Sequence, residues 1–389
     1  MRILIAPDKF KGTLSAREVA EAIATGLRDV LPDAKIDIVP MADGGEGTAE
    51  VIGDALGASW IKCKAHDPIG CEIDARYAWV DVQKLAVMEM SEAAGMRRLK
   101  PSELNPEIAT TFGVGEMILD ATKRGVGEII IGLGGSATND GGFGMARALG
   151  FQFFDDSDNE IKSASELTTL NRIERPSPAT SRPPLPEGEE QGEGKAAMQI
   201  VAAVDVRNPL LGENGATRVF GPQKGVMPDQ LEKFERALTR LADVIASQFG
   251  FDHRNEPGVG AAGGLGFGLM SFCGAKIQRG FDVVAKSVGL DSKMRDADIV
   301  ITGEGNLDRQ TLEGKTPAGV AQLAHKLGKR VFAFVGRATE DPNVRDLFDG
   351  VYQNARPAMS TEENMKRAAE LLQDNARQLA QDLKKMLKS

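Results

Sequence analysis

Both ends of the chain alternate short apolar runs with amphipathic helical stretches. An apolar run at Ile3–Ala6 precedes a polar segment, and Ser15 and Glu18 then have the spacing of a helix capping box. Apolar residues follow at helical spacing, at positions 19, 23, 27 and 30. A second strand-like run at Ile36–Pro40 completes the order strand, helix, strand, which predicts the opening of a parallel α/β unit.

The C-terminal hundred residues repeat this order. Strands are predicted at Asp298–Thr302, Arg330–Val335 and Gly350–Gln353, with a helix at Thr316–Leu327 between the first two. Five parallel strands, contributed by the two ends of the chain, would form a flavodoxin-like sheet.

A long final helix is predicted to follow Ser360, with Glu363 completing its cap. The residues expected to face the core are Met365, Ala369, Leu372, Ala376, Leu379, Leu383 and Met386. We therefore expect an α/β protein with a flavodoxin-like parallel sheet domain built from residues 1–60 and 290–389. A second, inserted α/β domain would occupy residues 61–289.

Composition excludes several classes of protein. The chain has 389 residues, a net charge of −9 and only 5% aromatic residues, which argues against a nucleic-acid partner. Three cysteines without a CxxC pair indicate the reducing cytoplasm. Pro257–Ala275 carries no charge, but its seven glycines predict a closely packed buried helix rather than a membrane span. Residues 176–195, with five prolines and four glutamates, are predicted to form a disordered surface loop.

Glycine and acidic residues cluster where most of the predicted strands end. These clusters are DKFKG (8–12), DGGEG (43–47), GGSATNDGG (134–142), DVRNPL (205–210) and GEGNLD (303–308). Open α/β sheets bind ligands at the carboxyl ends of their strands. A purely structural turn needs the glycine but gains nothing from the acid, so we expect a ligand site there.

One cluster also resembles a dinucleotide fingerprint. Residues 132–137 fit G-x-G-x-x-A after a strand, with Asp155 and Asp156 a little over twenty residues further on, so a dehydrogenase of small hydroxy acids is an alternative. Asp140, however, stands where the pyrophosphate-binding helix should begin, and it suits a magnesium phosphate or a substrate hydroxyl better. The chain has no Walker A motif.

Longer motifs resemble those of the bacterial glycerate kinase family. They include APDKFKGTLSA (6–16), ADGGEGT (42–48), TTFGVGE (110–116), IGLGGSATNDGG (131–142), DVRNPLLGENGA (205–216), FGPQKG (220–225), PGVGAAGGLG (257–266) and TGEGNLDRQTLEGK (302–315). The resemblance implies a flavodoxin-like domain interrupted by a second domain, and phosphorylation of glycerate by ATP with Mg²⁺. The usual product of this kind of member is 2-phosphoglycerate; an unrelated family makes the 3-phosphate.

The chain departs from the family pattern at three places. Lys9 stands where the family usually has Ser, so Lys11 is the family-like lysine. Asn306 stands where the family usually has Arg, which removes a candidate phosphate clamp. Residues 176–195 are additional sequence.

Phosphoryl transfer needs positioned phosphates, neutralised charge and a proton acceptor. The residues predicted to act in catalysis are Asp205 as general base or metal ligand, Lys11 as an anion-binding cation, and Asp8 as its orienting partner or the base. Substrate-binding residues are predicted to be Asp43, Ser136, Thr138, Asn139, Asp140 and Arg218, with Lys224 as a further cation. Nucleotide-binding residues are predicted to be Gly134, Gly135, Gly303, Glu304 and Lys315. Metal ligands are predicted to be Asp308 and Asp140.

The sequence thus predicts a cytoplasmic kinase of D-glycerate that uses ATP and Mg²⁺ and makes 2-phosphoglycerate. It does not determine which hydroxyl or enantiomer is used, which acid is the base, or whether the chain is a monomer or a homodimer. A 3-phosphoglycerate-forming kinase, the dehydrogenase and a protein that senses glycerate without turnover stay as alternatives. Histidine-based catalysis is not expected, because the three histidines fall outside every cluster.

Overall fold

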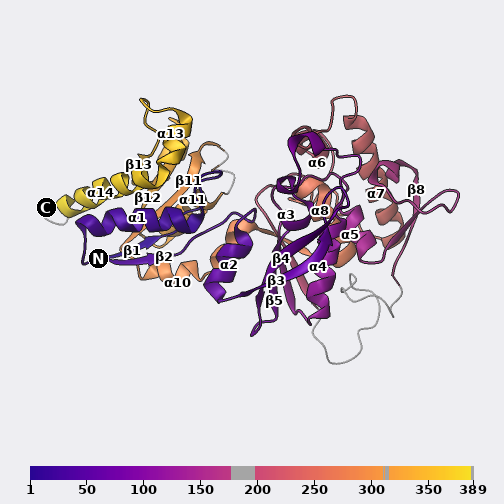
Figure 1. Cartoon of the computed structure of the whole chain (residues 1–389), viewed down its shortest axis with the longest axis horizontal. Coiled ribbons are helices and arrows are strands. Elements are labelled where there is room, and N and C mark those ends of the chain that lie inside the picture. Colours follow the sequence, from indigo (N-terminus) through magenta and orange to yellow (C-terminus); the bar gives the residue numbers. More distant parts are fainter. Residues whose placement is uncertain (177–197, 310, 312–314, 387–389) are drawn as a thin grey trace. The chain divides into compact units, whose positions relative to one another are not determined.

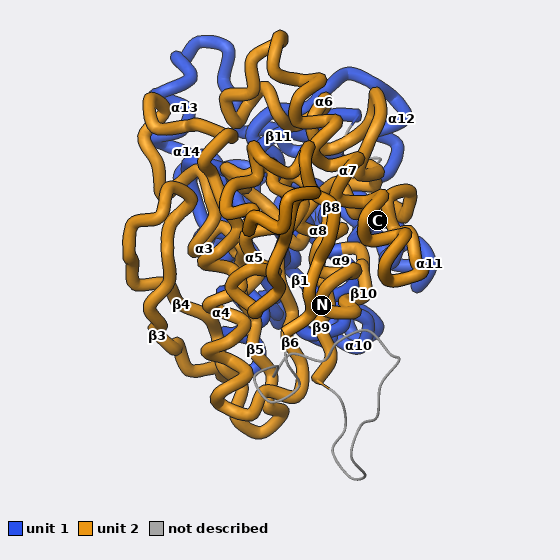
Figure 2. Tube along the Cα trace, turned by 90° about the vertical axis from the view of Figure 1, so that its right-hand side faces the viewer, with its two compact units in different colours: residues 1–43, 50–56, 280–389 blue, residues 44–49, 57–279 orange. Residues whose placement is uncertain are grey.

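The computed structural model describes residues 1–176, 198–309, 311 and 315–386 (Figure 1). The predicted loop at 176–195 lies, except for Pro176, outside the described residues. Contacts divide the chain into two compact units (Figure 2). Unit 1 comprises residues 1–43, 50–56 and 280–389, and unit 2 comprises residues 44–49 and 57–279. The predicted domain boundaries stay a prediction.

Unit 1 contains a five-stranded parallel sheet. Its order is β13-β12-β11-β1-β2. The strands are β1 (Arg2–Ile5), β2 (Lys35–Ile38), β11 (Ile299–Leu307), β12 (Arg330–Ala338) and β13 (Gly350–Gln353). Counted along the chain this is the order 2-1-3-4-5, which doubly wound sheets adopt. The predicted α/β class is confirmed, and the flavodoxin-like assignment stays a prediction.

Two long helices cover one face of this sheet. They are α1 (Ala16–Val30) and α14 (Ala368–Met386), which lie side by side in Figure 1. Their buried residues form one core with apolar residues of β1, β11 and β12. The predicted capping box starts α1, because the Ser15 hydroxyl accepts from the Glu18 amide and Glu18 accepts from the Ser15 amide.

Shorter helices complete unit 1. They are α9 (Gly280–Ser287), α10 (Leu290–Arg295), α11 (Thr316–Lys326), α12 (Pro342–Arg345) and α13 (Thr361–Lys366). Of these, α11 contacts β11 and β12.

Three sequence predictions for unit 1 are wrong. The final helix is interrupted at Arg367, whose ψ of 13° is not helical, so α13 and α14 are separate. Met365 and Met386 are exposed rather than core-facing, because they lie on the short α13 and at the last turn of α14. The third strand does not end at Thr302: β11 continues through Leu307 because it stays paired with β12 as far as Ala338.

Unit 2 contains a six-stranded mixed sheet in the order β10-β9-β6-β5-β4-β3. The strands are β3 (Ser59–His66), β4 (Glu72–Val80), β5 (Leu85–Glu89), β6 (Glu128–Gly132), β9 (Gln199–Val204) and β10 (Lys276–Arg279). β5, β6, β9 and β10 are parallel, whereas β4 is antiparallel to both its neighbours. A separate hairpin consists of β7 (Gln152–Asp155) and β8 (Leu170–Glu174).

The helices of unit 2 include one that is almost entirely apolar. They are α3 (Ser91–Ala94), α4 (Phe112–Lys123), α5 (Phe143–Ala148), α6 (Ala216–Phe220), α7 (Leu231–Phe249) and α8 (Ala261–Cys273); α2 (Thr48–Leu56) lies where the chain passes to unit 1. Ala262, Gly263 and Gly264 have positive φ and interrupt α8, and the helix that follows them to Cys273 is mostly buried, which confirms a buried helix within Pro257–Ala275. Within the described residues, no helix is long and apolar enough to cross a membrane.

Candidate active site

Unit 1 has a pocket of about 480 Å³ among the segments that follow its parallel strands. Five predicted site residues line it: Asp8, Lys11, Asp43, Glu304 and Lys315. They come from three of the glycine-and-acid clusters and, in the case of Lys315, from the position just before α11 (Thr316–Lys326). The pocket therefore joins residues about 300 positions apart in the sequence.

Asp8 is buried in this pocket and is held in one orientation. Its Oδ1 accepts from the Lys9 amide at 2.7 Å, and its Oδ2 accepts from the Thr316 hydroxyl at 2.8 Å. Burial, together with the negative charge of Asp43, raises the pKa of Asp8 to about 7. A carboxylate with this pKa suits proton transfer at neutral pH.

Glu304 is the second buried carboxylate of the pocket. It lies within β11, and its Oε1 accepts from the Thr311 hydroxyl at 2.7 Å. Burial raises the pKa of Glu304 to about 7, against the opposing effect of the Lys315 charge. The ionised state of Asp8 also contributes to this shift, so the two carboxylates influence each other.

Basic side chains line the same pocket. Lys9 and Lys11 come from the segment after β1, and Lys315 precedes α11. Arg337 also lines it and donates to the Thr361 hydroxyl at 2.8 Å. Sequence reasoning missed Arg337, which lies in β12 just beyond the apolar run Arg330–Val335 predicted as the strand.

Two predicted residues of unit 1 do not line the pocket. Asp308 accepts from the Asn306 side chain at 2.6 Å, and its amide donates to the Thr311 hydroxyl. Gly303 lies inside β11, where its carbonyl accepts from the Asp8 amide at 2.8 Å. In the described part of the chain, no three His, Cys, Asp or Glu residues are grouped so as to hold a metal ion. The predicted metal role of Asp308 stays a prediction.

In unit 2, the predicted residues 134–140 form one loop after β6. Gly135 has a φ of +69°, which favours glycine. A Cβ atom on Gly134 would lie 2.6 Å from the Cα of Gly45, so residues 44–47 pack directly on this loop. The two glycines therefore have a packing role, and their predicted contact with phosphate stays a prediction.

Lys224 lies under this loop and is almost completely buried. Its Nζ donates to the Thr138 carbonyl at 2.7 Å and to the Ser136 hydroxyl at 3.1 Å. Burial lowers the pKa of Lys224 to about 7, although the charge of Asp140 acts in the opposite direction. Lys224 thus holds the backbone of Thr138 and the side chain of Ser136, which are both predicted substrate-binding residues.

Asp140 is fully buried and surrounded by hydrogen-bond donors. It accepts from the amides of Gly142 and Gly144 and from both the amide and the hydroxyl of Thr111. These contacts favour a structural role at the start of α5. The predicted role of Asp140 as metal or substrate ligand stays a prediction.

Asn139 has one buried atom that the described residues leave unsatisfied. Its Nδ2 donates to the Thr217 hydroxyl at 3.0 Å, whereas no described residue donates to its Oδ1. A buried carbonyl oxygen without a partner is costly unless a ligand or water completes it.

Asp205 and Arg218 occupy different places in unit 2. Asp205 follows β9 and is partly exposed. Arg218, on α6, pairs with Glu232 and with Glu213, so its charge is already balanced by two carboxylates. Their predicted roles stay predictions.

The fold and the two groups of polar residues define an α/β protein with candidate ligand-binding side chains at the carboxyl ends of parallel strands. Comparison with known proteins gives the family. The sequence profile of the Glycerate kinase family matches residues 3–384. The chain belongs to this family and is a phosphotransferase, as the sequence resemblance predicted.

Individual relatives are similar over most of their length. The glycerate 2-kinase of Escherichia coli is 41% identical over 88% of this chain and 87% of its own. The glycerate kinase of Bacillus subtilis is 39% identical over 99% of this chain and 98% of its own length. A crystal structure from Salmonella typhimurium LT2 that carries the name glycerate kinase 2 has a TM-score of 0.84, 39% identity and full coverage of both chains.

Proposed function

We propose that the chain transfers the γ-phosphoryl group of ATP to the 2-hydroxyl of D-glycerate and forms 2-phosphoglycerate and ADP. The observation that carries the proposal is the unit 1 pocket, where two buried carboxylates with pKa values near 7 lie among basic side chains. Relatives named glycerate kinase and glycerate 2-kinase support glycerate as the phosphate acceptor and its 2-hydroxyl as the position of transfer. We expect the enzyme to act in the cytoplasm.

The cations of the pocket are proposed to bind the nucleotide phosphates. Lys315, Lys11 and Arg337 would supply positive charge beside the oxygens of the γ-phosphoryl group and of the leaving ADP, whose negative charge is redistributed in the transition state. Asp8 is the proposed proton acceptor for the attacking hydroxyl, because it is oriented by two hydrogen bonds and has a pKa near neutrality. Asp205 remains the alternative base.

Mg²⁺ fits the chemistry of the same residues. This ion is usually held by one or two carboxylates together with substrate phosphates and water. Glu304 and Asp43 line the pocket and supply such oxygens, so a site with fewer than three acidic ligands is expected for a magnesium nucleotide. When bound, the ion would neutralise phosphate charge.

The loop after β6 is proposed to bind the acid. Ser136, Thr138 and Asn139 supply hydroxyl and amide groups that match the hydroxyls of glycerate. Lys224 beneath them favours an anionic ligand.

The dehydrogenase alternative gains no support from Asp155. Its Oδ1 accepts from the Ser157 amide at 2.8 Å and from the Asn159 amide at 2.9 Å, so this carboxylate closes a turn. A ribose-binding acid would need free acceptor capacity for the 2′-hydroxyl.

The test is ADP release by the purified chain with ATP, Mg²⁺ and D-glycerate, followed by phosphorus NMR of the product. We expect turnover that stops with EDTA, and a 2-phosphate signal. L-glycerate and a reaction without acid are the controls. A 3-phosphate signal would overturn the position of transfer. A change in nicotinamide absorbance without ADP would support the dehydrogenase, and binding of glycerate without turnover would support the sensor.

A further inference from the structure

The chain after β5 runs beside the loop after β6. The Met96 amide donates to the Gly135 carbonyl at 2.8 Å, and the Ala137 amide donates to the Ala94 carbonyl at 2.9 Å. These backbone bonds fix Arg97 next to the loop proposed to bind the acid. No motif in the sequence had indicated this arginine.

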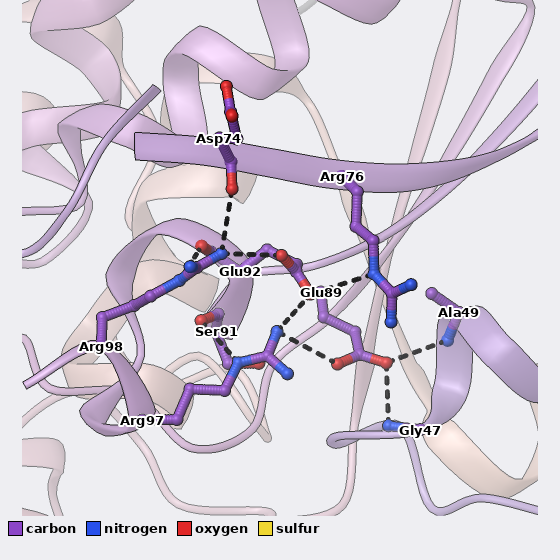
Figure 3. Close-up of polar contacts among 9 residues, drawn as sticks. All are labelled: Gly47, Ala49, Asp74, Arg76, Glu89, Ser91, Glu92, Arg97 and Arg98. Atoms are coloured by element: carbon purple, nitrogen blue, oxygen red, sulfur yellow. Dashed lines mark hydrogen bonds and ion pairs between the residues drawn. The ribbon is translucent and has the colours of Figure 1, made fainter. Parts of the chain in front are cut away.

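The guanidinium of Arg97 is oriented from two sides. Its Nε donates to the Ser91 carbonyl at 3.0 Å, and its Nη2 donates to Glu92 at 2.6 Å and lies 3.9 Å from a Glu89 oxygen (Figure 3). Its Nη1 makes no hydrogen bond to any described residue, and 38% of the side chain is exposed. The residue is therefore fixed in place and still has donors to offer.

Glu89 connects this arginine to the glycine-rich segment at 44–47. Glu89 is the last residue of β5, and its carboxylate accepts from the amides of Gly47 at 2.8 Å and Ala49 at 3.1 Å. Residues 44–47 in turn pack on Gly134. Arg97 thus belongs to the same group of loops as the proposed acid site.

The surroundings of Arg97 attract anions. It lines a pocket of about 380 Å³ together with three other basic residues, Lys62, Arg76 and Arg98, and with the acidic Asp74 and Glu92. In a chain with a net charge of −9, such a local excess of positive charge favours an anionic ligand.

We propose that Arg97 binds the carboxylate of the acid substrate and so selects acids over uncharged polyols; this inference rests on the proposed function. An arginine N–H donates a strong, charge-assisted hydrogen bond to a carboxylate oxygen, and Nη1 has N–H groups available for it. Glu92 and Glu89 offset part of the positive charge, so the site suits a single carboxylate better than a polyphosphate. Arg97 would act in binding rather than in the chemical step.

Arg98 provides a matched control. It also pairs with Glu92, at 2.9 Å, and its Nε donates to the Glu92 carbonyl at 2.7 Å. It makes no contact with Glu89 among its described interactions, and Figure 3 shows it on the side of Asp74. Arg97→Gln and Arg98→Gln each remove one positive charge of this pocket and one ion pair with Glu92, so they lose the same general attraction for anions, but only the first removes the proposed ligand.

The experiment measures steady-state kinetics and calorimetric binding of D-glycerate for the wild type and both variants. We expect Arg97→Gln to raise KM and Kd for glycerate about 10- to 100-fold, the range of a lost hydrogen bond to a charged group. The kcat and the KM for ATP should change little, and Arg98→Gln should leave Kd for glycerate within about threefold, since a partly exposed ion pair contributes little. Arg97→Lys should recover part of the affinity.

Glyceramide, which lacks the carboxylate charge, tests the specificity. Arg97→Gln should bind it as the wild type does, so the preference for glycerate should fall. Equal losses in the two variants, or a rise in KM for ATP alone, would overturn the inference. If the wild type binds glycerate without phosphorylating it, the proposed function fails while the binding comparison still tests Arg97. Thermal melts of both variants check that they are folded.

Discussion

At the scale of single residues, burial brings the pKa values of three ionisable groups close to 7. Asp8 and Glu304 are raised into this range, and Lys224 is lowered into it. Each is oriented by hydrogen bonds to neutral groups rather than by a direct ion pair. A small change in pH or in bound charge can therefore change their protonation.

Asp8 gives a prediction in which activity and stability change in opposite directions with pH. Its folded pKa of about 7 lies above the ordinary value of 3.8, so the folded state binds more protons between these values. Stability should therefore fall as pH rises from about 4 to about 7. The kcat should rise over the upper part of this range, because a proton acceptor must be ionised.

The variant Asp8→Asn tests the predicted pH dependence of both stability and kcat. We expect kcat to fall about 10²- to 10⁴-fold, the usual contribution of a general base, and the pH dependence of unfolding to become weaker. Profiles of kcat against pH and denaturant titrations at pH 5 and pH 8 provide the measurements. Glu304→Gln is the comparison, since it removes the other raised carboxylate but not the proposed base. A variant that keeps wild-type kcat would assign the base elsewhere, with Asp205 the next candidate.

At the scale of elements, the loop between β6 and α5 depends on one buried carboxylate. Asp140 accepts from two amides at the start of α5 and twice from Thr111, which precedes α4. It thereby connects two helices and the loop that carries Ser136 and Thr138. A residue in this position is needed for the shape of the loop even if it never touches a ligand.

Asp140→Asn should therefore destabilise unit 2. The amide side chain has one acceptor oxygen and would place an NH₂ group against backbone donors, so we expect a loss of about 2–4 kcal/mol in the free energy of unfolding. Chemical denaturation measures this loss. Asp155→Asn, in an exposed turn, is the control and should change stability little. Unchanged stability of Asp140→Asn combined with a weaker affinity for Mg²⁺ would instead support the metal-ligand hypothesis.

Sequence reasoning succeeded where the determining interactions are local. The capping box at Ser15 and the apolar strands follow from residues a few positions apart. It failed at β11, which is longer than predicted because it pairs with β12, a strand that is distant in the sequence. It also failed at Met365, which is exposed because the predicted long helix is interrupted at Arg367. Arg97 could not be identified, because its place beside the loop is set by a backbone hydrogen bond from the preceding residue, Met96, to Gly135, which is distant in the sequence.

At the scale of the whole molecule, the two units have separate hydrophobic cores. One core joins α1, α14 and the unit 1 sheet, and the other joins the strands and helices of unit 2, with no residue in common. Both tryptophans of the chain, Trp60 on β3 and Trp79 on β4, lie in unit 2. Tryptophan fluorescence thus reports unit 2 alone, whereas far-UV circular dichroism reports both units.

This difference predicts distinct effects of the two substrates on thermal unfolding. A ligand stabilises the unit that binds it, and a nucleotide at about 100 times its Kd should add about 2.7 kcal/mol, or about 5–10 °C. With Mg²⁺ and ADP we expect the melting midpoint seen by circular dichroism to rise, while the fluorescence midpoint stays within about 2 °C of its value without ligand. D-glycerate should raise the fluorescence midpoint.

EDTA should reverse most of the nucleotide effect, because Mg²⁺ neutralises the phosphates, and Lys315→Ala should weaken the nucleotide effect. A nucleotide-induced rise of equal size in both signals would contradict separate unfolding of the units, and a larger rise in the fluorescence midpoint than in the circular dichroism midpoint would place the nucleotide in unit 2.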